Sequence, residues 1–112
     1  MNTVIKELVP SKILESSQTT QYTAANVTTI IDKCTVTNYS GSTATVSINL
    51  IQKGGSSGNS NLIMKTKSLL AGETYNCPEI IGQVLNDGSF ISAIAGTATA
   101  INIRICGREV SN

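Results

Sequence analysis

The chain of 112 residues contains no histidine and no tryptophan, and few of its side chains carry charge. The absence of histidine excludes a Ser-His-Asp triad, a Cys-His pair and every other His-dependent form of acid–base catalysis. Charged residues make up 13% of the chain, against roughly 25% in an average soluble domain, and the formal net charge is +1. A nucleic-acid-binding protein normally carries a basic stripe. We therefore expect neither an enzyme nor a nucleic-acid partner.

Long apolar runs and paired cysteines are also missing. No run reaches the roughly 18 residues of a membrane span, and residues 1–10 lack the layout of a signal peptide, so we expect synthesis in a cytoplasm. The three cysteines are odd in number, widely separated and without a CxxC motif: Cys34, Cys77 and Cys106. This pattern favours reduced thiols, leaves a disulfide between two of them open, and predicts no metal and no cofactor.

The polarity of the chain comes instead from 14 Thr, 13 Ser and 10 Asn. Threonine favours strands, whereas serine and asparagine favour turns. Apolar and polar residues alternate most cleanly over 43–50, and the same period of two recurs over 89–95 and 99–106. Such alternation indicates strands with one face in a core and one face in water.

Turn residues recur at short intervals between these strands, with a clear turn at 38–42 and a Gly/Ser-rich loop at 53–61. We expect one helical turn at 78–81, with apolar side chains from 80 to 85 closing one end of the core. The spacing predicts an all-β, single-domain antiparallel β-sandwich that is jelly-roll-like. Residues 1–10 are expected to form an N-terminal arm, and residues 11–112 the sandwich. About eight strands are expected, at 11–17, 20–23, 27–37, 43–50, 62–68, 69–75, 89–95 and 99–106.

The candidate site residues are those that could contact a partner protein. Arg104 and Arg108 stand four apart on one strand, so they share a face and could grip carboxylates of a partner, or could simply be solvated. The four aromatic residues are too few for the stacked platform of a sugar-binding protein. Four apolar residues of the arm could lie on a neighbouring subunit: Val4, Ile5, Leu8 and Val9.

Four runs of the chain carry a family resemblance: LAGETY at 70–75, PEIIG at 78–82, VLNDGSFISA at 84–93 and ATAINIRICGRE at 98–109. They resemble the small capsid decoration proteins, also called cement or staple proteins, of short-tailed bacteriophages of the Salmonella and Bordetella type. The likeness covers residues 11–110.

The resemblance implies a jelly-roll-like virion protein on the outer surface of the capsid. It would self-associate as a dimer or trimer and cement neighbouring subunits of the major capsid protein. The alternative is a carbohydrate-binding or adhesion module of a phage tail or fibre. If the arm contacts a neighbouring subunit, deletion of residues 1–6 should weaken capsid binding and leave the fold intact.

Overall fold

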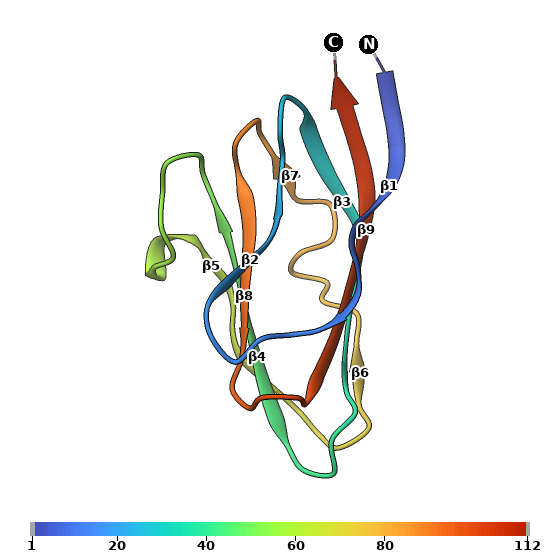
Figure 1. Ribbon diagram of the computed structural model, residues 1–112, viewed down its shortest axis with the longest axis vertical. Helices are drawn as coiled ribbons and strands as arrows, with labels where there is room; N and C mark the ends of the chain where they lie inside the picture. The colour runs from blue at the N-terminus through green and yellow to red at the C-terminus, as the bar shows by residue number, and fades with distance from the viewer. Residues whose placement is uncertain (1, 112) are drawn as a thin grey trace.

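The computed structural model describes residues 2–111, which form two antiparallel sheets packed face to face (Figure 1). The first, sheet A, has the order β1-β9-β3-β6, with β7 also paired to β3, and the second, sheet B, has the order β2-β8-β4-β5. Sheet A comprises β1 (Asn2–Ile13), β9 (Ile101–Ser111), β3 (Thr28–Asn38), β6 (Thr74–Tyr75) and β7 (Val84–Leu85). Sheet B comprises β2 (Thr19–Thr23), β8 (Phe90–Ala95), β4 (Ala44–Ile51) and β5 (Leu62–Leu69).

The chain passes from one sheet to the other at almost every connection. The exceptions are the β4–β5 hairpin and the step from β6 to β7, two short strands that both pair with β3. Counting β6 and β7 as one interrupted strand gives two four-stranded sheets wound around each other, which is the jelly-roll arrangement. The predicted all-β sandwich is therefore confirmed.

The core lies between the sheets and follows the predicted alternation. Ile101, Ile103 and Ile105 of β9 are fully buried, and so is the inward face of β8. β9 is the second strand of its sheet, flanked by β1 and β3, so its branched side chains pack against strands on both sides as well as against sheet B. These three positions form the centre of the apolar core.

The predicted helical turn at 78–81 is wrong, because this segment consists of successive turns. Backbone hydrogen bonds tie it to β3: Gly82 N donates to Ile31 O at 2.7 Å, and Ile31 N donates to Gln83 O at 3.0 Å. These bonds draw the segment into the sheet edge. Ile80 and Leu85 close the core as expected, whereas Ile81 and Val84 are exposed. The one 3₁₀ turn among residues 2–111 lies in the loop before β5, at Asn59–Asn61.

The N-terminal segment also differs from the expected arm. Residues 2–10 belong to β1, a strand of 12 residues that runs antiparallel to β9. β9 extends to Ser111 and so offers backbone partners from Ser111 to Cys106 for residues Asn2 to Glu7. Both termini consequently lie side by side at one end of the molecule (Figure 1).

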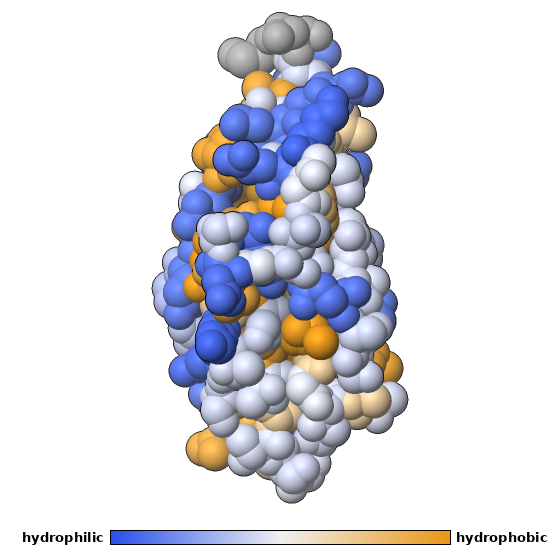
Figure 2. All heavy atoms as spheres, turned by 90° about the vertical axis from the view of Figure 1, so that its left-hand side faces the viewer, coloured by the Kyte–Doolittle hydropathy of each residue, from blue (hydrophilic) through white to orange (hydrophobic). Residues whose placement is uncertain are grey.

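The outer face of sheet B is polar. Hydrophilic and neutral residues cover most of it, and hydrophobic groups appear as small separate patches (Figure 2). The loop before β5 lies against this face through Asn49, whose Nδ2 donates to Asn61 Oδ1 at 2.7 Å and to Gly58 O at 3.2 Å. These hydrogen bonds anchor the Gly/Ser-rich loop to the sheet.

Candidate interaction surface

The outer face of sheet A carries a row of side chains that crosses four strands near the chain termini. Arg108 of β9 lies between Ile5 of β1 on one side and Ile30 of β3 on the other. Ile30 in turn lies opposite Val84 of β7. We call these four residues the outer row. Ile5 is 85% exposed and Val84 is 55% exposed. Apolar side chains held at this exposure on a paired sheet could be buried by a partner with little loss of conformational freedom.

Two ion pairs lie on the same face, and one of them includes Arg108 of the outer row. Arg104 Nη1 lies 2.6 Å from Glu7 Oε2, and Arg108 donates to Asp32 through Nη2 at 2.9 Å and through Nε at 3.0 Å. The neighbouring carboxylate raises the pKa of each arginine. The two arginines share the outer face, as the sequence predicts, but each already has a carboxylate partner within the chain. A partner protein would meet two neutralised pairs rather than two free cations.

Two of the four apolar residues expected at a partner interface face the protein's own core. Leu8 is 5% exposed and Val9 is 1% exposed, so neither is accessible to a partner. The reason is a bulge between Glu7 and Val9, which turns two successive side chains inward. Val4 and Ile5 precede the bulge and remain exposed. The bulge therefore divides β1 into an exposed half and an anchored half.

Gly107 of β9 explains how Leu8 reaches the core. A Cβ atom at this position would lie 2.2 Å from the Ile30 carbonyl oxygen and 2.8 Å from Leu8 Cδ1. The missing side chain leaves the space that the bulged Leu8 fills. A glycine inside a strand often marks such a close approach.

On the inward side of the same end, a polar cluster links four strands of the two sheets. Lys6 Nζ lies 3.3 Å from Glu109 Oε1. Tyr22 of β2 donates its hydroxyl hydrogen to Glu109 Oε2 and shares a 2.7 Å hydrogen bond with Thr29 Oγ1. Burial, followed by the bond to Glu109, raises the pKa of Tyr22 to about 12. The Tyr22 hydroxyl group therefore stays protonated at physiological pH, and its hydrogen bonds join β2 to β9 and β3.

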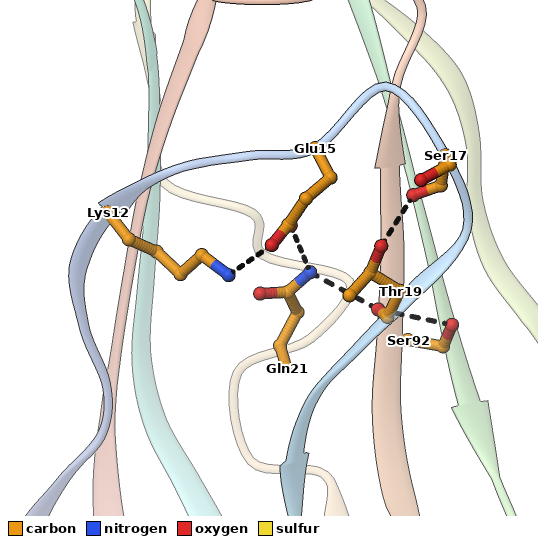
Figure 3. A network of polar contacts seen from close by, with 6 residues as sticks. All are labelled: Lys12, Glu15, Ser17, Thr19, Gln21 and Ser92. Carbon is orange, nitrogen blue, oxygen red and sulfur yellow. Dashed lines mark hydrogen bonds and ion pairs between the residues drawn. The ribbon is translucent and has the colours of Figure 1, made fainter.

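A second polar cluster fixes the crossing from β1 to β2 (Figure 3). Lys12 Nζ donates to Glu15 Oε2 at 2.6 Å, and Gln21 Nε2 donates to Glu15 Oε1 at 3.0 Å and to Thr19 O at 3.2 Å. The bonds from Lys12 and Gln21 lower the pKa of Glu15 to about 2. Gln21 Oε1 is buried and has no hydrogen-bond partner. The carboxylate of Glu15 thus holds the linker against both edge strands.

β1 is an edge strand, since it pairs with β9 on one side and with no strand of residues 2–111 on the other. Edge strands are usually protected by proline, charge or bulges. Here Pro10 and both bulges lie in the second half of the strand, whereas charged residues lie in both halves: Lys6 and Glu7 in the first, and Lys12 in the second. The half from Asn2 to Glu7 keeps a regular register to β9 and contains neither a proline nor a bulge. Its free backbone groups could accept a further strand.

The tyrosines do not form an exposed cluster. Tyr22 is buried, and the ring of Tyr75 lies under Lys67 Nζ, 4.6 Å from the ring centroid, while its hydroxyl donates to Glu79 Oε2 at 2.7 Å. Tyr39 is exposed in the turn after β3. A stacking platform for sugars needs several exposed rings in one place.

The arrangement defines this chain as a jelly-roll β-sandwich. Comparison with protein-family models, curated proteins and solved structures gives no match. No helix of residues 2–111 is long and apolar enough to cross a membrane. Within the same residues, no group of three or more Cys, Asp and Glu side chains could hold a metal ion.

Proposed function

We propose that this chain is a non-catalytic virion protein that binds the outside of an assembled phage capsid and cements neighbouring subunits of the major capsid protein. The observation that carries the proposal is the outer row, in which the apolar side chains of Ile5, Ile30 and Val84 lie around the paired Arg108 on a rigid sheet, with the Arg104–Glu7 pair beside them. Protein interfaces combine such an apolar centre with a polar rim. The protein would be made in the host cytoplasm and join the particle there.

Assembly on a lattice makes modest contacts sufficient. A contact of standard size buries on the order of 800 Å² per partner. A protein that touches several lattice subunits at once gains avidity of roughly a hundredfold or more over one contact. Because the complete site exists on the assembled shell, binding also stabilises that shell by mass action.

Self-association completes the proposal, and the open half of β1 is the surface we assign to it. Antiparallel pairing of this half with the same half of a second copy satisfies the free backbone groups of both. Such self-complementary pairing closes about a twofold axis and gives a dimer. Ile5 stays on the outer face in this dimer, because strand pairing uses backbone groups rather than side chains.

The test measures binding of the purified chain to phage heads assembled without it. Ile5→Asp should weaken binding at least about tenfold, since it replaces an exposed apolar side chain of the outer row with a charged one. Leu70→Asp is the matched control, because Leu70 is also exposed, at 66%, but lies in the turn after β5 at the opposite end of the molecule. The control should bind within about twofold of the unmodified chain.

A truncation separates head binding from self-association. Deletion of residues 1–6 should abolish the dimer in analytical ultracentrifugation and weaken head binding, whereas Ile5→Asp should weaken head binding and keep the dimer. Leu8 and Val9 remain in the truncated chain, so its thermal unfolding should stay cooperative. Unaltered head binding by both variants would overturn the assignment of the outer row as the binding surface. Absence of head binding by the unmodified chain would overturn the capsid assignment, and retention on a glycan column would replace it with the tail or fibre alternative.

A further inference from the structure

Two of the three cysteines face each other in the core. β3 and β6 pair Val36 with Tyr75 and Thr37 with Thr74. Cys34 stands two residues before Val36, and Cys77 stands two residues after Tyr75. β6 ends at Tyr75, and a continuation of its register by two residues would bring Cys77 opposite Cys34; both side chains are fully buried in the same core cluster.

The two thiols also influence each other. Cys77 is the neighbour that most raises the pKa of Cys34, ahead of burial, and Cys77 Sγ lies 3.8 Å from Tyr75 O. A disulfide needs Cα atoms roughly 4.4–6.8 Å apart, a separation typical of residues on neighbouring segments of one sheet.

The backbone of Cys77 supplies an independent observation. Its φ is +45°, in the left-handed region that a residue with a Cβ seldom occupies. β6 ends two residues earlier, at Tyr75, yet the side chain of Cys77 is fully buried in the core. A conformation of this kind persists where the surroundings demand it.

We propose that Cys34 and Cys77 are an oxidisable pair that forms a disulfide between β3 and the segment after β6. A small-molecule disulfide such as glutathione disulfide is the oxidant. One cysteine thiolate displaces glutathione to give a mixed disulfide, and the second thiolate attacks the protein sulfur and releases the second glutathione. Two thiols lose their hydrogens, one S–S bond forms, and glutathione disulfide is reduced to two glutathiones.

Cys106 is excluded from the bridge by its position. It lies on the outer face of sheet A, opposite Glu7 of β1 and Lys33 of β3, and it is partly exposed. The sheet separates it from the buried pair. Because both members of the pair are buried and Cys34 resists ionisation, the bridge should form during folding rather than in the folded, reduced protein.

The experiment refolds the full chain from denaturant with reduced and oxidised glutathione, then alkylates it in denaturant. We expect the mass to fall by two hydrogens and one alkyl group to be added, on Cys106, instead of three. Cys106→Ser should keep the bridge, and Cys34→Ser and Cys77→Ser should each lose it. Should a core variant fail to fold, peptide mapping of the unmodified oxidised chain identifies the bridge without it.

Stability gives a second measurement. The bridge closes a long loop that contains β4 and β5, so the unfolding midpoint should rise by roughly 10 °C or more and fall again on addition of dithiothreitol. Three alkylated cysteines after oxidative refolding, a bridge that includes Cys106, or an unchanged midpoint would overturn the proposal. None of these results bears on capsid binding, which uses the outer face of sheet A.

Discussion

Gly107 is the one glycine within the strands of residues 2–111, and Gly107→Ala should destabilise the protein strongly. The added Cβ would lie 2.2 Å from the Ile30 carbonyl oxygen, whereas a relaxed carbon–oxygen contact is close to 3.3 Å. The β9–β3 ladder must therefore open by about 1 Å in its middle. Overpacking of this kind costs about 3 kcal/mol when the obstructing atom belongs to the backbone. For a domain of this size the melting temperature should fall by roughly 10–15 °C.

Thermal unfolding followed by circular dichroism measures the effect, with Gly41→Ala as the matched control. A Cβ at Gly41 meets nothing within 4 Å, so its melting temperature should change little. A double variant tests the cause. If the Leu8 side chain were the main obstacle, Leu8→Ala should restore stability to Gly107→Ala, whereas a clash with the Ile30 carbonyl predicts no rescue. Two results would refute the reasoning: full restoration of stability in the Leu8→Ala/Gly107→Ala double variant, or a Gly107→Ala protein with the same melting temperature as the unmodified chain.

Two further predictions concern the core and the linker after β1. Ile103→Ala should lower the free energy of unfolding by about 3–4 kcal/mol, because this fully buried side chain lies in the strand between β1 and β3. Urea unfolding measures the change. The control, Asn102→Ala on the outer face, should lower the free energy of unfolding by less than about 0.5 kcal/mol. Glu15 has its pKa lowered from 4.5 to about 2, so its contribution is present above pH 4.5 and is lost as the pH falls towards 2. The carboxylate is more than a third exposed, so we expect it to contribute about 1 kcal/mol to the free energy of unfolding. In urea unfolding between pH 5 and 2, the stability of Glu15→Gln should therefore depend less on pH than that of the unmodified chain. An equal pH dependence of the two proteins would contradict this role.

The fold could be predicted because the strands that build the core keep an unbroken period of two. Ile101, Ile103 and Ile105 alternate with polar residues, and all three are buried. Prediction failed where a bulge breaks the period. The pair Leu8-Val9 shows no alternation in sequence because both side chains face inward, so residues 1–10 were expected to form an arm before a strand at 11–17, whereas β1 runs from Asn2 to Ile13.

The interaction surface was predictable to a smaller extent. Ile5 and the shared face of Arg104 and Arg108 followed from the sequence. Ile30 carried a signal in the Ile30-Ile31 doublet, since one of two successive residues faces outward wherever a strand keeps its regular pleat. Val84 and Asp32 carried none, because their places depend on which distant strands become neighbours. The Lys12–Glu15–Gln21 cluster likewise has no sequence spacing that would reveal it.

Under the proposed function, β1 would contribute to both stability and binding, and the bulge after Glu7 separates the two roles. Before the bulge, β1 extends along β9 with its side chains in water and its backbone edge open. After it, Leu8 and Val9 enter the core and the Lys12–Glu15 pair holds the turn towards β2. Substitutions in the first half should therefore alter partner contacts at little cost to folding, while substitutions in the second half should act mainly on stability.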